Sequence, residues 1–357
     1  MINTLIYRQL TRFSATRPDL ATDLNPADER PIETLREGSE CIHLIRSMSA
    51  CRAVLSDDQS FEPSPIAEAV RIIGERFGLD VSAACEFLRE NPMQLADEAH
   101  TKRRRQYLSH YAETLRRASG KFQQIADARL ATLAETPPRS LVGDLVEPFI
   151  DDVLQHVAAT RGVAPGDYAG VSRDNHVLLE HVHHPRKLEQ KSRQITAFNA
   201  PDKSQDNALL SYILQGRDPM IGGITAFLHC LFRMPPAERR SALASITAAR
   251  LYRISSPVNY IGRLARQHVC IDGAEIAPGD QVLLLLPGAN GDPAAASDSR
   301  GVAFGAGDHT CAGQAIALSI TDAFLAALRD RQDDIDWSVL QEDIPTTAVF
   351  RQYKARS

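Results

Sequence analysis

The sequence of 357 residues lacks the features that place a protein in a membrane or on nucleic acid. Its first twenty residues hold no apolar run long enough for the core of a signal peptide or for a membrane anchor. No later segment approaches the roughly 18 uninterrupted apolar residues of a transmembrane helix. An excess of basic residues is also missing, because the 40 Lys and Arg are outnumbered by 45 Asp and Glu, which gives a net charge of −5. We therefore expect a soluble, cytoplasmic protein that binds neither nucleic acid nor membrane.

Cysteine pairs with metal-binding spacing are missing as well. The six cysteines are scattered along the chain, without a C-x-x-C pair or a short disulfide-rich segment. This distribution is typical of a reducing compartment and argues against a zinc cluster. The segment His181-Val-His-His184 could bind a metal, but it has no Cys or carboxylate at motif spacing, so a surface loop is favoured.

Hydrophobic periodicity in the first half of the chain is helical. It predicts two short helices within residues 64–91, one long amphipathic helix over 96–134, and a further helix over 140–160 after the break at Pro137-Pro138. The last of these has apolar residues at helical spacing. The first half therefore indicates an α-helical protein.

The second half mixes helices with short strands. Residues 207–232 predict a strongly apolar helix, 235–254 another helix, and 314–328 a third. Between them, residues 255–287 carry β-branched residues and Gly-containing turns, which predict short strands. We expect one mainly α domain over 1–357 with a small β region.

The segment 304–313, FGAGDHTCAG, is the most informative part of the sequence. Its glycines allow a tight turn and a close approach of the backbone to a flat ligand. Cys311 precedes a predicted helix, whose N–H groups and positive end would stabilise a thiolate. A dinucleotide loop would need glycine in place of Thr310 and a surrounding βαβ unit. A turn with a packed cysteine is the remaining alternative.

This segment resembles the haem-ligand signature of the cytochrome P450 superfamily, F-G-x-G-x-H-x-C-x-G. The matching residues are Phe304, Gly305, Gly307, His309, Cys311 and Gly313. The resemblance implies a mainly α, haem-embedding fold with a small β subdomain. It also implies haem b (iron-protoporphyrin IX), with Cys311 as the axial iron ligand and Phe304, Gly305, His309 and Gly313 in the cofactor-binding loop.

Other segments resemble family landmarks in the expected order, from about residue 40 to the end. Residues 100–104 resemble H-T-x-x-R, which implies that His100 and Arg104 bind haem propionates, and Arg263 stands where a further propionate ligand is expected. Residues 53–61, 273–282 and 289–293 match weaker motifs. Arg and His suit dianionic propionates because they form charge-assisted hydrogen bonds. For His100, a place on a basic, solvated helix face stays open.

The sequence departs from the family pattern in the distal helix. The family motif A/G-G-x-D/E-T-T falls on residues 215–220, QGRDPM, so that Asp218 keeps the acid while Pro219 replaces the threonine that helps to deliver protons. Positioned proton transfer is typically worth about 10²–10⁴-fold in rate. Thr225 lies about 10 Å further along the helix and cannot obviously substitute. We assign Asp218 to proton transfer or substrate orientation, with a capping or solvated acid as the alternative.

Two further departures concern the opposite side of the haem. Arg253 resembles the arginine of the E-x-x-R motif, but Arg250 replaces its glutamate partner. We expect another carboxylate or a propionate to compensate, or this corner to be more open. Only ten residues separate Pro293 from Phe304, where the family usually has a longer meander. That meander normally packs against E-x-x-R, so the two changes belong together.

The resemblance implies hydroxylation or a related oxidation of a small organic molecule in a biosynthetic pathway. Ferredoxin or flavodoxin is the expected electron donor, and the basic run at 101–105 is either its docking patch or a solvated helix face. Because Pro219 weakens the default monooxygenase reading, two alternatives stay open. One is a peroxide-dependent or non-redox haem-thiolate enzyme, and the other is a degenerate member that acts as a binding module.

Overall fold

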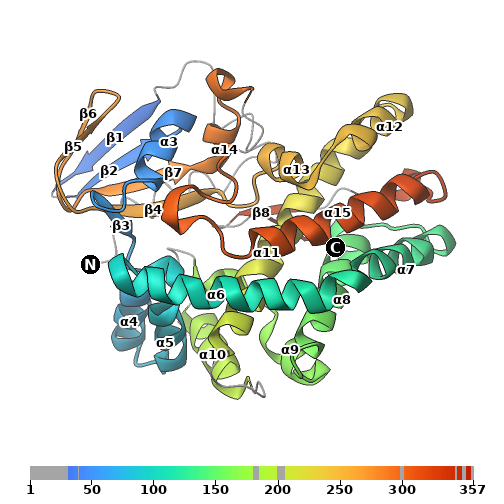
Figure 1. The fold of residues 1–357 in the computed structure, drawn as a ribbon, viewed down its shortest axis with the longest axis horizontal. Helices are drawn as coiled ribbons and strands as arrows, with labels where there is room; N and C mark the ends of the chain where they lie inside the picture. The colour runs from blue at the N-terminus through green and yellow to red at the C-terminus, as the bar shows by residue number, and fades with distance from the viewer. Residues whose placement is uncertain are drawn as a thin grey trace.

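The computed structural model describes residues 31–38, 40–179, 185–198, 206–297, 301–341, 344–347 and 351–354. Within them the protein is mainly α-helical with a small β region, which confirms the predicted fold class (Figure 1). The helices are α3 Met48–Leu55, α4 Ile66–Phe77, α5 Ser82–Glu90, α6 Asp97–Ala118, α7 Phe122–Glu135, α8 Glu147–Ala159, α9 Pro165–Val171, α10 Pro185–Ala197, α11 Asp206–Phe232, α12 Pro236–Ser245, α13 Ala248–Ile254, α14 Leu286–Asn290 and α15 Gln314–Arg331.

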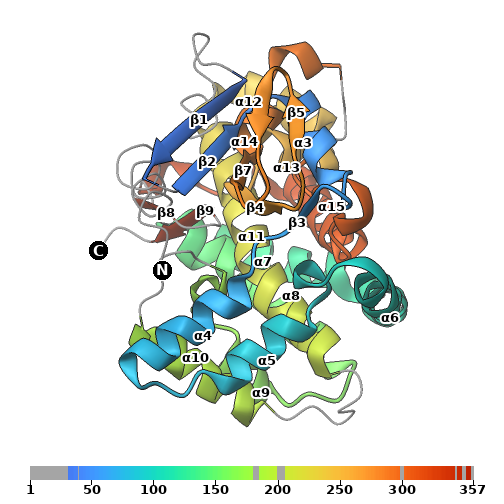
Figure 2. The same cartoon turned by 90° about the vertical axis from the view of Figure 1, so that its left-hand side faces the viewer.

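Strands β1 to β7 gather at one end of the molecule, whereas β8 and β9 form a separate pair beside α11 (Figure 2). The strands are β1 Ile32–Glu37, β2 Glu40–Ile45, β3 Phe61–Pro63, β4 Tyr260–Ala265, β5 Val269–Ile271, β6 Ala274–Ile276, β7 Gln281–Leu285, β8 Ile344–Thr347 and β9 Arg351–Lys354. Five of them form a sheet in the order β1-β2-β7-β4-β3, in which only β2 and β7 run parallel. The short strands predicted within 255–287 are therefore present.

Strand β7 is buried on both faces, which explains its uninterrupted apolar sequence. Val282 and Leu284 pack in a small core with α3, whereas Leu283 and Leu285 pack in the large core of the helical part. This division follows from the alternation of side chains along a strand. The sheet is thus fixed against the helices, and β4 beside it carries Arg263, paired with Val282.

Two segments that were each predicted to form one continuous helix form two helices instead, so those two predictions are wrong. The helix expected over 96–134 consists of α6 and α7, with a 3₁₀ turn at Ser119–Lys121 between them. Gly120 lies at this break, and glycine disfavours a continuous helix. The helix expected over 235–254 consists of α12 and α13. There Ile246 is extended and the Thr247 side chain accepts a hydrogen bond from the Arg250 N–H, so Thr247 begins a new helix.

The remaining helix predictions are confirmed. Helices α4 and α5 fall within 64–91, and Gly78 ends α4 in the left-handed conformation that glycine favours. The helix expected over 140–160 begins with a π-helical turn, Leu141–Val146, and continues as α8. Helix α11 passes through the middle of the molecule and continues past Pro219, and α15 follows the Cys311 loop (Figures 1 and 2).

Candidate functional site

A cavity of about 290 Å³ lies between α6, α11, β4 and the loop that precedes α15. Apolar side chains such as Ile66, Met93, Leu179 and Met220 make up much of its wall. Residues 303–305 and 309–313 form another part of the wall and include Cys311. The predicted cofactor loop therefore faces a largely apolar cavity, as expected for a small-molecule site.

The backbone of the Cys311 loop is folded back on itself. The Cys311 N–H donates to the Phe304 carbonyl at 2.8 Å, and the Gly305 N–H donates to the Val302 carbonyl at 2.9 Å. Gly307 has a φ of +66°, and a Cβ atom at this position would lie 2.5 Å from the Leu55 carbonyl oxygen. Glycine is therefore required at Gly307 both by conformation and by the close approach of α3.

The Cys311 thiol lies at the start of α15 and faces the cavity. Burial raises its pKa, while hydrogen bonds from the Gly313 and Gln314 N–H groups and the positive charge of Arg104 lower it. Burial is the larger effect in the protein alone. The predicted hydrogen-bond donors are thus present, and a bound metal cation would supply the charge that holds the sulfur as a thiolate. Phe304 packs edge-on against Tyr252, with ring centroids 5.1 Å apart, which supports the turn.

Four basic side chains from three parts of the chain meet at the cavity wall. His100 and Arg104 come from α6, Arg263 from β4, and His309 from the Cys311 loop. The rings of His100 and His309 stack with their centroids 3.9 Å apart. Arg104 donates to the Thr310 carbonyl, which ties α6 to the loop. All four residues are those that the sequence assigned to propionate binding.

Several donors in this basic group have no protein partner. His100 Nε2 and Arg263 Nε make no hydrogen bond within the protein. Both atoms are buried, and the exposed fraction of each residue is only 5%. A buried polar group without a partner is costly, so its presence in a cavity wall points to a ligand that satisfies it. Arg263 can only donate and is positively charged, so a ligand that satisfies its Nε must accept a hydrogen bond, and a negatively charged ligand suits it best.

The pKa values of the group point the same way. Burial and nearby positive charge lower the pKa of His100, and they lower the pKa of His309 to about 3. Burial also lowers the pKa of Arg263 to about 10. Asp58 lies 3.8 Å from His309 Nε2, and burial raises the pKa of this acid. The cavity wall is thus short of negative charge, and an anionic ligand would relieve that shortage.

The donor set fits haem. Haem presents a metal to a thiolate and two carboxylates at its edge, and the wall offers Cys311 together with unsatisfied cationic donors. A flat, largely apolar macrocycle also suits the apolar wall. A packed cysteine without function, the alternative left open by the sequence, would not explain the orphaned donors of His100 and Arg263 on the same cavity.

Helix α11 presents one face to the cavity. Successive residues on a helix are rotated by about 100°, which places six residues on that face. They are Ser211, Tyr212, Gln215, Gly216, Pro219 and Met220. Neither Asp218 nor Thr225 belongs to the described wall of the cavity, and this face carries Pro219 and Met220 at the two threonine positions of the motif.

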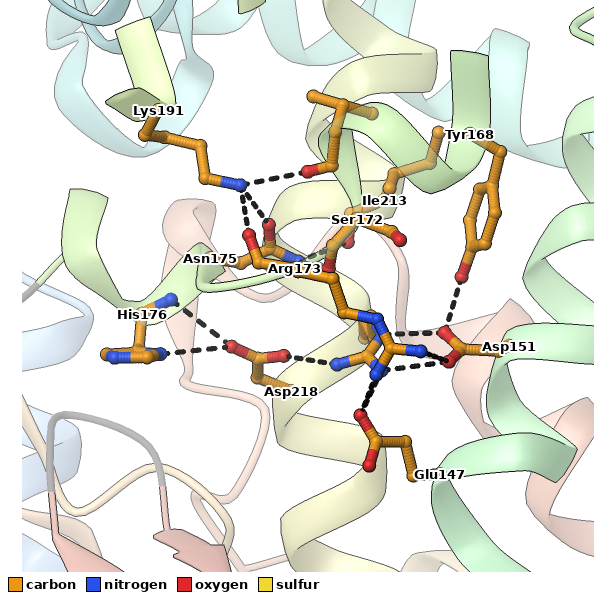
Figure 3. A network of polar contacts seen from close by, with 12 residues as sticks. Glu147, Asp151, Tyr168, Ser172, Arg173, Asn175, His176, Lys191, Ile213 and Asp218 are labelled. Atoms are coloured by element: carbon orange, nitrogen blue, oxygen red, sulfur yellow. Dashed lines mark hydrogen bonds and ion pairs between the residues drawn. The ribbon is translucent and has the colours of Figure 1, made fainter. Parts of the chain in front are cut away.

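Asp218 instead belongs to a buried ionic network on another face of α11 (Figure 3). Its carboxylate accepts from Arg217 Nη1 at 3.2 Å and from the His176 backbone N–H at 3.2 Å. Arg217 also binds Asp151 and Glu147 of α8. Burial alone would raise the pKa of Asp151, but the hydrogen bonds and charge of Arg217 lower it. The catalytic prediction for Asp218 therefore lacks geometric support, because its carboxylate is engaged away from the cavity.

A polar cluster that the sequence did not reveal lines the cavity near α11. Asn91 Nδ2 lies 3.1 Å from both Ser211 Oγ and Gln215 Oε1, and Ser211 Oγ donates to Gln215 Oε1 at 2.6 Å. Gln215 Nε2 reaches the sulfur of Met93 at 2.9 Å. The four-residue spacing of Ser211 and Gln215 was a signal for a shared helix face. Asn91, more than a hundred residues earlier, had none.

Main-chain carbonyls take the place of the missing glutamate beside Arg253. Its guanidinium donates to the carbonyls of Ala295 at 2.7 Å and of Asn290 and Ala296 at 3.4 Å. Gly301 lies against it, and a Cβ atom there would meet the side chains of Asn290 and Arg253. Arg250 is exposed. The hydrogen bonds to Arg253 thus come from the backbone of the shortened segment, whereas the sequence led us to expect a carboxylate, a propionate or a more open corner.

Two further predictions concerned the basic run at 101–105 and the histidine-rich segment at 181–184. In the basic run 101–105, Lys102 and Arg105 are exposed, and Arg103 forms an ion pair with Glu90 at 3.3 Å. The stretch His181-Val-His-His184 lies outside the described residues. Across the described part of the chain, none of the helices combines the length and apolar character that a membrane crossing needs.

The fold and the cavity together define a helical protein built to hold a flat anionic ligand beside a cysteine. No sequence-family model matches the chain. It is 34% identical over 132 residues to cytochrome P450 CYP199A2 of Rhodopseudomonas palustris, a match that spans 33% of this chain and 32% of that protein. It is also 25% identical to cytochrome P450-SU2 of Streptomyces griseolus, over 91% of this chain and 88% of the relative.

Solved structures give the same answer for the fold. The structure of CYP108D1 from Novosphingobium aromaticivorans has a TM-score of 0.72 at 18% identity, and it covers 95% of this chain and 92% of its own. The structure of P450 StaH, from glycopeptide antibiotic biosynthesis, has a TM-score of 0.68 at 21% identity, with 95% and 98% covered. Both relatives and both solved structures are cytochrome P450s, so the chain is similar in sequence and in fold to the cytochrome P450 superfamily.

Proposed function

We propose that this protein is a haem-thiolate enzyme that oxidises a small organic molecule by hydroxylation or a related reaction. The observation that carries the proposal is the meeting of Cys311 with four basic side chains on one apolar cavity. Two of those side chains, His100 and Arg263, have buried donors without partners. Haem b supplies both halves of what this arrangement lacks, a metal for the thiolate and carboxylates for the donors.

Each residue of the site has a defined task in this proposal. Cys311 binds the iron, with the Gly313 and Gln314 N–H groups hydrogen-bonded to its sulfur. His100, Arg104, Arg263 and His309 bind the propionates, and Phe304, Gly305 and Gly313 shape the loop beside the macrocycle. Thiolate-bound haem supplies oxidation chemistry strong enough for unactivated C–H bonds. The protein contributes position, exclusion of water and charge.

The substrate class follows from the rest of the cavity wall. Ile66, Leu179 and Met220 favour an apolar body, while the Asn91–Ser211–Gln215 cluster offers hydrogen bonds to one polar group. A few placed polar groups in an apolar pocket give orientation and specificity. The likeness to an enzyme of antibiotic biosynthesis supports a role in a biosynthetic pathway. We propose a cytoplasmic enzyme with ferredoxin or flavodoxin as donor, docked on the basic run of α6.

A second candidate is oxidation that uses peroxide in place of dioxygen and a reductase. It is favoured by one observation, the absence of an acid or threonine from the described cavity face of α11, where Pro219 and Met220 stand. Delivery of protons from this face must then come from water, the substrate or the Gln215 cluster. A non-redox rearrangement would likewise need no acid or threonine on this face to deliver protons.

The test is spectroscopic first and kinetic second. Purified protein is reduced under carbon monoxide, and the strongly red-shifted Soret band of a thiolate-bound haem is the expected result. Turnover of a library of apolar compounds is then compared with ferredoxin and its reductase against peroxide alone, with oxygen insertion detected by mass spectrometry. Reductase-driven insertion supports the first candidate and peroxide-only insertion the second. Folded protein that takes up no haem overturns both and leaves a binding module.

A further inference from the structure

A second cluster of chemically active side chains lies in the five-stranded sheet, away from the haem cavity. Cys41 and His43 are two residues apart on β2 and so point to the same side of the strand. Asp280 directly precedes β7, the parallel neighbour of β2. The ligand atoms of these three residues all lie within 4.8 Å of one another. None of the three lines the cavity.

The cluster converges on a single ring nitrogen. His43 Nε2 lies 3.5 Å from Cys41 Sγ and 2.9 Å from Asp280 Oδ2. In a nucleophilic Cys-His-Asp arrangement the acid would hold the opposite nitrogen, Nδ1, and leave Nε2 to the thiol. Here both side chains compete for the same nitrogen, and one N–H cannot bond well to both. A nucleophile activated by His43 is therefore excluded by this geometry.

We propose that Cys41, His43 and Asp280 form a zinc-binding site with a fourth position open to water. Thiolate, imidazole and carboxylate are the ligands that zinc takes in proteins. Tetrahedral zinc with bonds of about 2.0–2.3 Å separates sulfur and nitrogen by about 3.5 Å, and nitrogen and oxygen by about 3.3 Å. The observed 3.5 Å and 2.9 Å need only a small opening of the second pair.

The surroundings of the cluster support its role as a ligand set. His43 is fully buried, and its Nδ1 lies 3.0 Å from Thr34 Oγ1, which would accept its proton and leave Nε2 free for a metal. The Ala277 N–H donates to Asp280 Oδ2 at 2.9 Å and fixes that carboxylate. Cys41 is half-buried, and the Asp280 side chain is 14% exposed, so an ion and a water molecule can reach them.

Sequence spacing could not reveal this site. Scattered cysteines without C-x-x-C argued against a zinc cluster, but that argument applies to sites whose ligands come in local pairs. Here one ligand is 237 residues from its nearest partner. The bound ion would join β2 to the turn before β7, in the same sheet that carries Arg263 on β4.

The test measures zinc bound by the full haem-containing protein. The protein is equilibrated with Zn²⁺, dialysed, and analysed for zinc and iron per chain, with titration calorimetry for the affinity. We expect one zinc per chain, lost in Cys41→Ser and in Asp280→Asn. Thr34→Val should weaken zinc binding about 10- to 100-fold, as expected for loss of a group that orients a ligand. Cys270→Ser, which removes an exposed thiol elsewhere on the protein, is the matched control and should keep one zinc.

The outcomes separate cleanly, and the iron content reports the haem site independently. His43→Ala is avoided because the side chain is fully buried and its loss could unfold the sheet. Zinc that binds equally to Cys41→Ser and the native chain overturns the proposal, as does the absence of binding to the native chain. Loss of zinc in Cys270→Ser also overturns it, because the ion would then sit on a surface thiol.

Discussion

The Cys311 loop and the middle of α11 line the same cavity, yet the two regions relate to the family pattern in opposite ways. In the loop, five of the six residues that match the signature line the cavity: Phe304, Gly305, His309, Cys311 and Gly313. In α11, the helix continues through the expected position, but its acid is bound to Arg217 on another face and its cavity face carries Pro219 and Met220. Retention of the cofactor and delivery of protons are therefore separable properties of this cavity.

The largest expected effect is at the loop. Cys311→Ala removes the only thiol in the described wall of the cavity, so we expect complete loss of the thiolate-type Soret band in the reduced, carbon-monoxide-bound protein. Cys270→Ala, at an exposed thiol, is the control and should leave the spectrum unchanged. A thiolate-type spectrum in Cys311→Ala would assign the ligand to another cysteine. The Cys311 loop would then no longer be the part of the cavity that follows the family pattern.

The second prediction concerns stability at α11. Arg217→Met leaves the carboxylates of Asp151 and Asp218 without their buried cation, and we expect the free energy of unfolding to fall by about 3–5 kcal/mol. Arg173→Ala is a matched control, since Arg173 pairs with Glu147 and Asp151 from a side chain that is 56% exposed. Its loss should cost less than about 1 kcal/mol in denaturant titrations. Equal losses in the two variants would contradict a structural role specific to Arg217.

The third prediction separates cofactor binding from folding. Arg263→Leu should weaken haem retention about 10- to 100-fold, because a hydrogen bond to a charged group contributes about 1.5–3 kcal/mol. The same change should leave the haem-free protein as stable or more stable, since it removes a buried, poorly partnered cation. Haem transfer to an apo-globin acceptor measures the first effect and chemical denaturation the second. Arg105→Ala, exposed on α6, should alter neither.

Proton delivery gives the fourth prediction. Asp218→Asn should change turnover less than about threefold, with reductase or with peroxide, because the carboxylate does not reach the cavity. A side chain that relayed protons would be worth about 10²–10⁴-fold. A loss of that size in reductase-driven turnover alone, with haem content and stability preserved, would restore the catalytic assignment that the sequence suggested.

The last prediction is a modest pH dependence of stability in the same network. Burial lowers the pKa of Lys191 from 10.5 to about 8, against the attraction of Asp218 and Asp174. At pH 9 the unfolded chain therefore keeps a proton that the folded chain has released, so this residue adds stability as pH rises through about 8. Between pH 7 and pH 9 the stability of the native chain relative to Lys191→Met should grow by about 1 kcal/mol. A constant difference would mean that Lys191 stays charged, held by its three oxygen acceptors.

The parts of the site that could be predicted are those with a local signature. The Cys311 loop and the pair His100 and Arg104 are set by short segments whose side-chain directions follow from a turn or a helix face. Arg263 could be located only through its position relative to the other motifs that resemble the family; the structure places it on β4. The fold class followed in the same way, from helical periodicity and a short β region.

What could not be predicted depends on partners that are distant in the chain. Asp218 was assigned from its position in a motif. Its side chain binds Arg217, and Arg217 is held by Asp151 and Glu147 of α8, which are distant in the sequence. Asn91 contacts Gln215 only because the end of α5 lies beside the middle of α11. The breaks at Gly120 and Thr247 were also missed, because apolar periodicity continues across each of them.

The contact at Arg253 has a consequence for how this protein can vary. A pair of side chains is lost by a single substitution at either position, whereas carbonyl oxygens are present whatever residue carries them. The segment 290–296 can therefore change most of its side chains and still hold Arg253, provided that its path is kept. The path itself is constrained by Gly301, where even one added carbon would collide. This corner should tolerate many replacements and very few insertions or deletions.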